Sequence, residues 1–305
     1  MRKSIVVGTR GSRLALIQTE SVVTKIREMN PGIEVSVNKI VTAGDRDRHT
    51  QLDRIGVAVF VKELEEALLD NRIDLAVHSF KDVPMEIPVG LCLLAVTERS
   101  DPRDVLVSKS RLEELPPGSK IGTGSLRRSA QVIGCRPDLV VGAIRGNIDT
   151  RLNKVYSGKF DGVILAGAAM MRLGWEDKVT QYLDLEHFLP AVGQGALVVE
   201  ARLDDEEMSE IVSPFNHVPT WQSVTAERAF LHALGGGCRA PIAALGTVDG
   251  GRLKLRGMVS DVTTGKALIG EEEGDAWSPE ETGVRLAQNM ISMGAADLMA
   301  REKQT

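Results

Sequence analysis

The sequence has little that would support a disulfide framework, a zinc site or a membrane span. Its three cysteines, Cys92, Cys135 and Cys238, are an odd number without a Cys-x-x-Cys pair, whereas disulfide-rich and zinc-binding domains use even sets or closely spaced pairs. The five histidines show no metal-ligand spacing, so no metal site is predicted. No apolar run approaches the length of a transmembrane helix, and residues 5–7 are too short for a signal-peptide core. We therefore expect a cytoplasmic protein without a membrane partner.

Charge and length set further limits. The net charge of −5 argues against a generic nucleic-acid-binding protein, so no nucleic-acid partner is expected. A hydrophobic content of 43% and a charged content of 26% are ordinary for a globular chain. At 305 residues the chain is long for a single core, which predicts two or three domains.

Two similar glycine-rich corners stand out, at residues 8–13 (Gly-Thr-Arg-Gly-Ser-Arg) and 122–128 (Gly-Thr-Gly-Ser-Leu-Arg-Arg). Each follows a short β-branched run and precedes a helical pattern. A strand that turns through glycines into a helix presents unpaired N–H groups and the positive end of the helix dipole. Ser12 and Ser125 suit the N-cap, and the adjacent arginines suit a carboxylate or phosphate. The two corners predict a duplicated α/β unit with its ligand between the copies.

A second pair of similar segments favours the same duplication. Residues 71–79 and 158–167 each read as a turn, an acidic residue and a buried-type strand that ends in small residues. Short α/β strands can look alike by chance, but two such echoes in the same order are better explained by duplication. The glycine-rich turn and strand at 190–200 are predicted to return the chain to the first unit.

The sequence also predicts a further strand, a long loop and a separate C-terminal domain. Residues 33–41 alternate as a half-buried strand should. The polar segment 42–54 reads as a long surface loop, and such loops are often lids. From about residue 217 the pattern is that of a small α+β domain, with helices predicted at 224–234 and 279–300 and short strands between them.

The strand at 73–77 runs directly into His78-Ser79-Phe80-Lys81-Asp82. Because ligands of open α/β sheets bind beyond the carboxyl ends of strands, Lys81 and Asp82 are candidates for chemistry. The alternative is that Asp82 is a turn residue and Lys81 a solvated neighbour.

Six arginines stand at strand ends or helix starts. Each alone could be an ordinary surface residue, but together they require polyanionic charge opposite them. They are Arg10, Arg127, Arg128, Arg145, Arg151 and Arg172. Cys238 follows a triglycine segment, and it is either an inert buried thiol or an accessible nucleophile with a lowered pKa.

Taken in order, several motifs resemble the hydroxymethylbilane synthase family, also called porphobilinogen deaminases. The similarity runs from the first strand to the cysteine loop and is weaker in the C-terminal part. The motifs are Phe-Val-Lys-Glu-Leu-Glu at 60–65, Ala-Val-His-Ser-Phe-Lys-Asp-Val-Pro at 76–84, Ile-Gly-Thr-Gly-Ser-Leu-Arg-Arg at 121–128, Ile-Arg-Gly-Asn-Ile-Asp-Thr-Arg-Leu at 144–152, Pro-Ala-Val-Gly-Gln-Gly-Ala at 190–196 and Gly-Gly-Cys at 236–238.

The resemblance implies an α/β fold of three domains. The first, residues 1–97 with 195–214, and the second, residues 98–194, would be like type II periplasmic binding proteins. The third, residues 217–305, would be a small α+β domain that carries the cysteine. A monomer is expected.

The implied reaction joins four porphobilinogen molecules head to tail, each losing ammonia, and releases hydroxymethylbilane with water. A covalent dipyrromethane cofactor would be held by a thioether to Cys238, and Asp82 would be the catalytic residue. The acetate and propionate groups of the linked pyrroles explain why arginines gather here. A carboxylate can hydrogen-bond the pyrrole N–H and stabilise the cation that forms when ammonia leaves.

The resemblance also assigns the remaining site residues. Those expected to bind the cofactor are Lys81, Thr123, Ser125, Arg127, Arg128 and Arg151. Those expected to bind substrate or the growing chain are Arg10, Ser12, Arg145, Arg172, Gln194 and Phe60. One departure is clear: residues 54–60 lack a lysine and two glycines that are usual in the family's lid, so the lid is expected to be stiffer.

Two other functions compete with this interpretation. One is a non-enzymatic small-anion-binding protein of the periplasmic type, against which the Gly-Gly-Cys loop counts. The other is a phosphate-ester enzyme that uses the same two corners.

Overall fold

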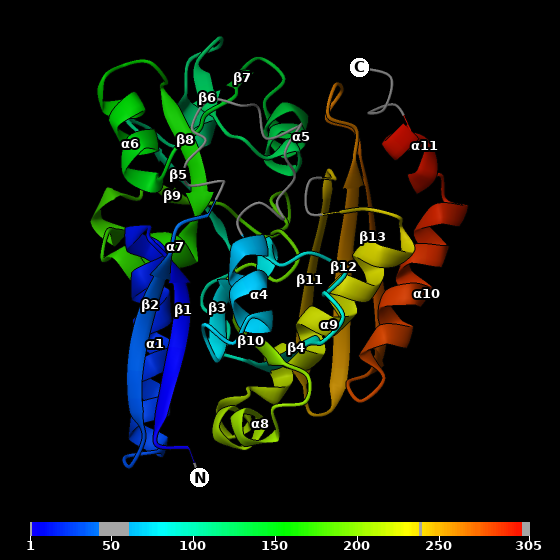
Figure 1. Ribbon diagram of the computed structural model, residues 1–305. Coiled ribbons are helices and arrows are strands. Elements are labelled where there is room, and N and C mark those ends of the chain that lie inside the picture. Colours follow the sequence, from blue (N-terminus) through cyan, green and yellow to red (C-terminus); the bar gives the residue numbers. More distant parts are fainter. Residues whose placement is uncertain (1, 43–60, 238–239, 301–305) are drawn as a thin grey trace. The chain divides into compact units, whose positions relative to one another are not determined.

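The computed structural model describes residues 2–42, 61–237 and 240–300. The chain forms two compact units, which comprise residues 1–99 with 196–221 (unit 1) and residues 100–195 with 222–305 (unit 2). Each unit contains a five-stranded mixed sheet, and unit 2 also has a three-stranded antiparallel sheet (Figure 1). The predicted α/β class is confirmed, as is the return of the chain at 190–200, because the strand that follows lies in the sheet of unit 1. The proposed three-domain boundaries stay a prediction.

Unit 1 is built on a sheet of order β2-β1-β3-β10-β4. Strand β1 is parallel to β2 and β3, and β10 is antiparallel to β3 and β4. The elements are β1 (Ser4–Arg10), α1 (Arg13–Met29), β2 (Glu34–Ile40), α4 (Lys62–Leu69), β3 (Leu75–Ser79), the 3-10 turn η2 (Phe80–Asp82), β4 (Leu91–Val96), β10 (Leu197–Arg202), α8 (Glu206–Val212) and η5 (Ser213–Phe215).

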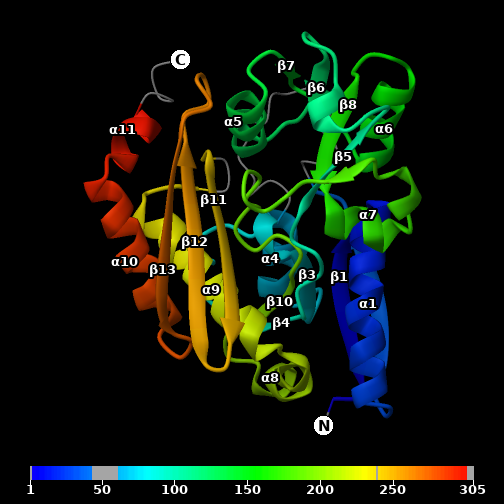
Figure 2. The same ribbon diagram turned by 180° about the vertical axis from the view of Figure 1, so that it is seen from behind.

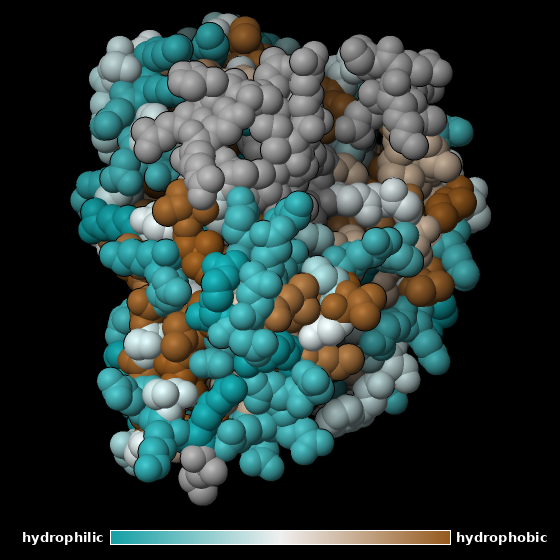
Figure 3. All heavy atoms as spheres, viewed as in Figure 1, coloured by the Kyte–Doolittle hydropathy of each residue, from teal (hydrophilic) through white to brown (hydrophobic). Residues whose placement is uncertain are grey.

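The sheet of unit 1 is covered on both faces, as a largely parallel sheet must be. Helix α1 packs Val22 and Ile26 against Ile5 of β1 on one face, and Figure 2 shows this helix in front of β1. Helix α4 packs Leu64 and Leu68 on the other face. Hydrophilic side chains lie over much of the outer surface of α4 (Figure 3), and most of its apolar side chains are buried.

The sheet of unit 2 has the equivalent order, β7-β6-β8-β5-β9. Strand β6 is parallel to β7 and β8, and β5 is antiparallel to β8 and β9. The elements are β5 (Asp104–Ser108), η3 (Leu112–Glu114), β6 (Lys120–Gly122), α5 (Leu126–Cys135), β7 (Val140–Gly142), α6 (Ile148–Tyr156), β8 (Gly162–Ala166), α7 (Gly167–Leu173), η4 (Glu176–Lys178) and β9 (Gln181–Tyr182). The predicted duplication is therefore confirmed at the level of strand order.

The duplication extends to single hydrogen bonds before β3 and β8. Asn71 and Gly158 both have positive φ angles, of 58° and 73°, a conformation that asparagine and glycine tolerate best. Three residues later, Asp74 accepts a hydrogen bond from the N–H of Val6 on β1 at 2.8 Å, and Asp161 accepts one from the N–H of Lys120 on β6, the equivalent strand, at 2.7 Å. The second pair of similar segments in the sequence thus marks equivalent strand entries.

The C-terminal part is a three-stranded antiparallel sheet with helices packed on it. Its elements are α9 (Val218–Ala233), β11 (Ile242–Asp249), β12 (Arg252–Ser260), β13 (Ala267–Asp275), α10 (Pro279–Ser292) and α11 (Ala295–Ala300). The prediction of one final helix over 279–300 is wrong, because Gly294 has a φ of 97° and separates α10 from α11. Helix α9 begins six residues before the predicted start at 224.

Helix α9 ends in a Schellman motif just before the cysteine loop. Gly235, at a φ of 67°, donates its N–H to the carbonyl of His232, and Gly236 donates to that of Leu231. A Cβ on Gly236 would lie 2.5 Å from Ile242, so glycine is required there for packing. Cys238 itself, Phe60 and residues 43–59 of the predicted lid region lie outside the described residues.

Candidate functional site

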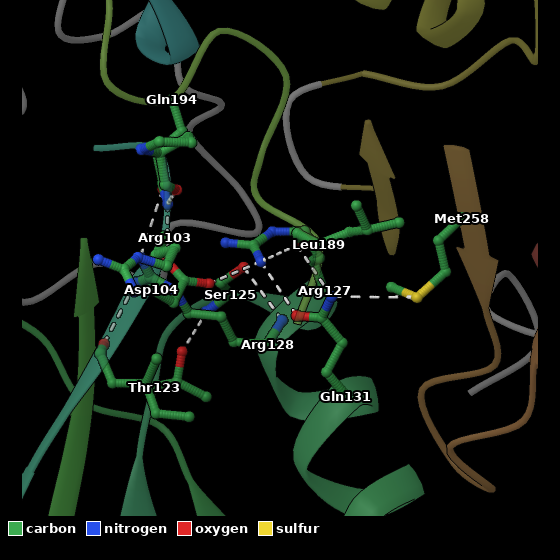
Figure 4. A network of polar contacts seen from close by, with 12 residues as sticks. Arg103, Asp104, Thr123, Ser125, Arg127, Arg128, Gln131, Leu189, Gln194 and Met258 are labelled. Atoms are coloured by element: carbon green, nitrogen blue, oxygen red, sulfur yellow. Dashed lines mark hydrogen bonds and ion pairs between the residues drawn. The ribbon is translucent and has the colours of Figure 1, made fainter. Parts of the chain in front are cut away.

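In unit 2, two consecutive arginines at the start of α5 converge on one buried carboxylate (Figure 4). Nη1 of Arg127 lies 2.7 Å from Oδ2 of Asp104, and Nη2 of Arg128 lies 2.6 Å from Oδ1 of the same residue. Asp104 is fully buried, and the two arginines are 3% and 6% exposed. This is an ion-pair triad inside the domain, at the first residue of β5.

The carboxylate is held ionised by its neighbours. Burial alone would raise the pKa of Asp104, but the guanidinium groups of Arg127 and Arg128 outweigh burial and hold that pKa well below its usual range. Burial also lowers the pKa of Arg127, against the opposing effect of Asp104, although an arginine remains protonated at neutral pH. One carboxylate faces two guanidinium groups, so the triad retains one positive charge.

Two glutamines complete the network. The Gln194 amide donates to Asp104 Oδ1 at 2.8 Å and to the carbonyl of Pro102 at 2.7 Å. Gln131, one turn after Arg127, accepts from that arginine at 3.0 Å and donates to the carbonyl of Leu189 at 2.9 Å. Arg127 also donates to the Leu189 carbonyl at 2.6 Å. The planes of both guanidinium groups are thereby fixed.

The position of these arginines costs stability rather than adding it. They stand in the first turn of α5, where the helix dipole favours acidic side chains and no acidic residue is present. The Nε atoms of Arg127 and Arg128 are buried without a hydrogen-bond partner among the described residues. Unsatisfied buried donors and a retained positive charge are features of an anion-binding site.

Arg172 is a further cation of unit 2. Unlike Arg127 and Arg128, it has no carboxylate partner in the described part of the chain. Its Nη2 donates to the carbonyl of Gly195 at 2.7 Å and lies 3.4 Å from Oγ of Ser100. Burial lowers the pKa of Arg172 to about 10. A desolvated guanidinium that meets only neutral groups is poised to bind an anion.

The other predicted residues of unit 2 lie at the carboxyl edge of its sheet. Ser125 caps α5 through its hydroxyl, which accepts from the N–H of Arg128 at 3.5 Å, and Thr123 accepts from the N–H of Ser125 at 3.1 Å. Arg145 follows β7, and the Arg151 guanidinium donates to the carbonyl of Gly146 at 2.8 Å. The predicted N-cap role of Ser125 is confirmed.

In unit 1, the predicted residues gather at the equivalent edge. Arg10 ends β1, and Ser12 caps α1 by accepting from the N–H of Ala15 at 3.2 Å, which confirms its predicted N-cap role. Lys81 and Asp82 lie in η2, directly after β3. Because β1 and β3 are parallel neighbours, their carboxyl ends share one edge of the sheet. All four residues therefore stand at the edge where α/β sheets bind ligands.

Sequence reasoning missed Asp104. The signal was present, because an aspartate directly before the apolar run Val105-Leu106-Val107 must be buried with its strand and so needs cationic partners. The arginine pattern alone predicts that the compensating charge comes entirely from a ligand. The structure shows that part of it comes from the protein itself.

Two features, a metal-binding cluster and a membrane-spanning helix, are absent from the described residues. Among the described residues, no group of three or more histidine, cysteine, aspartate or glutamate side chains is arranged to hold a metal ion. Within residues 2–42, 61–237 and 240–300, no helix has both the length and the apolar character needed to cross a bilayer.

The chain matches two family models. Residues 5–210 match the porphobilinogen deaminase dipyromethane cofactor binding domain, and residues 221–292 match the porphobilinogen deaminase C-terminal domain. The chain is 47% identical over 309 residues to a porphobilinogen deaminase of Bacillus subtilis (strain 168), with 100% of this chain and 98% of that protein covered. It is 45% identical over 304 residues to one of Geotalea uraniireducens (strain Rf4), with 99% and 96% covered.

Solved structures with a similar chain path include extracellular binding proteins. The probable amino-acid ABC transporter extracellular-binding protein ytmK of Bacillus subtilis is 11% identical, with a TM-score of 0.44 and coverage of 70% of this chain and 90% of that one. A putative periplasmic sulfonate-binding protein, SsuA of Methylobacillus flagellatus KT, is 15% identical, with a TM-score of 0.42 and coverage of 77% and 68%.

Proposed function

The chain belongs to the porphobilinogen deaminase family, and we propose on that basis that it is a hydroxymethylbilane synthase. It joins four porphobilinogen molecules head to tail with loss of ammonia and releases the linear tetrapyrrole hydroxymethylbilane. The cofactor is dipyrromethane, attached by a thioether to Cys238.

The observation that carries the proposal is the excess of buried positive charge in unit 2. The triad of Asp104, Arg127 and Arg128 keeps one positive charge and two unsatisfied N–H donors. Arg172 adds a largely desolvated guanidinium whose hydrogen bonds to the described residues all go to neutral groups. A ligand with several carboxylates offsets these charges, and the acetate and propionate groups of linked pyrroles are such carboxylates.

The residues fit a dipyrromethane cofactor. Arg127, Arg128 and Arg151 would hold its carboxylates, with Lys81, Thr123 and Ser125 as further polar contacts. When bound, the cofactor supplies the pyrrole carbon from which the chain is extended. Arg10, Ser12, Arg145, Arg172, Gln194 and Phe60 would bind the incoming substrate and the growing chain.

Asp82 is the proposed catalytic residue. It lies in η2 at the carboxyl edge of the unit 1 sheet and is partly exposed, and its carboxylate makes no hydrogen bond or ion pair with the described residues. A free carboxylate at this place can accept the pyrrole N–H of the substrate and stabilise the cation that forms as ammonia leaves. It can also move a proton to or from the reacting ring.

Intact-protein mass spectrometry together with ammonia release tests the proposal. The purified chain should carry the mass of two linked pyrrole units and should release ammonia from porphobilinogen. Cys238→Ser should remove the added mass, with Cys135→Ser as the matched control because that exposed thiol lies on α5. An unmodified mass and tight anion binding without ammonia release would favour the binding-protein alternative. Turnover of phosphate esters would favour the alternative of a phosphate-ester enzyme.

We further propose a cytoplasmic monomer that acts without nucleic acid. The net charge of −5 supports the absence of a nucleic-acid partner, and the small number of cysteines supports the cytoplasmic location. Light scattering of the purified chain tests the monomer, since a mass of twice 33.0 kDa would contradict it.

A further inference from the structure

A buried histidine–glutamate hydrogen bond in unit 1 has no part in the site described so far. Nε2 of His78 lies 2.9 Å from Oε2 of Glu200, and the two residues are 5% and 0% exposed. His78 is the penultimate residue of β3, and Glu200 lies on the neighbouring antiparallel strand β10. The pair therefore links two adjacent strands near the carboxyl end of β3.

This end of β3 leads directly into the turn that carries Asp82. Phe80 is 3% exposed, and its N–H donates to the carbonyl of Ala196 at 3.0 Å, which extends the contact between the two chain segments beyond the strand. The N–H of Val83 closes the turn on the carbonyl of Phe80 at 3.1 Å. Since the Asp82 side chain has no hydrogen bond or ion pair to the described residues, its place depends on the backbone below it.

A buried pair of this kind is not needed for stability. Apolar side chains of similar size at both positions commonly give equal or greater stability, because a buried carboxylate and its polar partner must be desolvated on folding. The surroundings of the pair increase this desolvation cost. Oε1 of Glu200 and Oε1 of Glu65 on α4 are both buried without a hydrogen-bond partner among the described residues, and burial and then the charge of Glu200 raise the pKa of Cys92 on β4. The pair is therefore better explained by a role in fixing the position of one strand against the other than by a contribution to folding stability.

We propose that the His78–Glu200 pair is a positioning pair, which fixes the carboxyl end of β3 against β10 and so sets the position of Asp82 for reaction. The proposal rests on the function proposed above, but its structural half concerns the chain alone. The pair acts through the backbone of residues 79–82 and touches no substrate.

Three variants separate positioning from stability. H78L/E200L replaces the pair with apolar side chains and should fold, keep its cofactor mass and keep the KM for porphobilinogen within about threefold, while kcat falls at least about thirtyfold. E200Q still accepts a hydrogen bond from His78 and should keep kcat within about threefold.

D74N is the control at the other end of β3, where Asp74 pairs with Arg2 at 3.0 Å and Arg202 at 3.2 Å. It should lower stability and leave kcat unchanged.

Amide hydrogen exchange gives a readout that does not depend on activity. Exchange at residues 79–83 should accelerate in H78L/E200L and not in D74N. If H78L/E200L does not fold, H78N, whose shorter side chain cannot span to Glu200, takes its place in both measurements. Wild-type kcat, or unchanged exchange at 79–83, in a folded variant without the pair would overturn the proposal. If the wild-type chain itself fails to consume porphobilinogen, the proposed function fails, and exchange still decides whether the pair anchors the turn.

Discussion

Nη2 of Arg128 lies 2.6 Å from Oδ1 of Asp104, deep inside unit 2. The other oxygen of the same carboxylate takes Arg127 at 2.7 Å. Asp104 therefore allows two adjacent guanidinium groups to be buried at the start of a helix, where the helix dipole opposes both. Asp104 neutralises only one of the two positive charges. The triad therefore stays folded inside the domain and can still attract an anion.

Asp104→Asn should lower the free energy of unfolding by about 3–5 kcal/mol, because it leaves two buried guanidinium groups without their counter-charge. Denaturant unfolding measures this. Asp138→Asn is the matched control, since Asp138 pairs with Arg136 at 2.6 Å on the surface, and it should cost less than about 1 kcal/mol. Equal losses in the two variants would contradict the structural role assigned to Asp104.

Arg172→Gln should raise the KM for porphobilinogen about tenfold, because it removes a desolvated charge that would bind a substrate carboxylate. The free energy of unfolding should fall by no more than about 1 kcal/mol, since the guanidinium has no carboxylate partner in the described residues and the substitution removes only hydrogen bonds to neutral groups. Steady-state kinetics and denaturant unfolding measure the two effects. Arg111→Gln, which breaks an exposed pair with Glu113, should change neither, and an unaltered KM in Arg172→Gln would remove Arg172 from the substrate site.

Asp82→Asn should retain the added cofactor mass and lose at least about a hundredfold in kcat, because an amide cannot stabilise the developing cation or carry the proton. Stability should be unaffected, since the carboxylate makes no hydrogen bond or ion pair with the described residues. Ammonia release and intact mass measured on the same preparation separate the two effects. Glu86→Gln, at an exposed position a few residues on, should behave as wild type. Turnover by Asp82→Asn at the wild-type rate would assign the chemistry elsewhere.

Glu65 gives the protein a specific dependence of stability on pH. Burial first, and then the charge of Glu200, raise the pKa of Glu65 from 4.5 to about 7. The unfolded chain ionises from pH 4.5 upward while the folded chain keeps the proton, so stability is present in full below pH 4.5 and is lost as pH rises to about 7. The loss should be about 1–3 kcal/mol over this window.

Glu65→Gln should remove this loss, so the difference in unfolding free energy between wild type and variant changes between pH 4.5 and 8. Thermal or denaturant unfolding across that range measures it. Glu66→Gln, exposed on the same helix, should keep the wild-type dependence. Parallel curves for wild type and Glu65→Gln would show that Glu65 ionises normally in the folded protein.

Local chemistry explains which parts of the fold could be predicted. The β-branched runs, the serine N-caps at Ser12 and Ser125 and the turns at Asn71 and Gly158 act within a few residues, so their signals are visible in the sequence. The break at Gly294 was missed because an apolar helical pattern continues on both sides of it. The left-handed backbone angle at that glycine separates the two helices.

The sequence by itself determined the duplicated α/β units, the edges at which Lys81, Asp82 and the arginines stand, and the family, because strand and corner motifs are short and recur in order. Only the tertiary structure decided which charges meet. Asp104 lies 23 and 24 residues from its two arginines, and His78 lies 122 residues from Glu200. No local pattern encodes such pairs, since they arise when strands distant in the chain become neighbours and bury their charged side chains together.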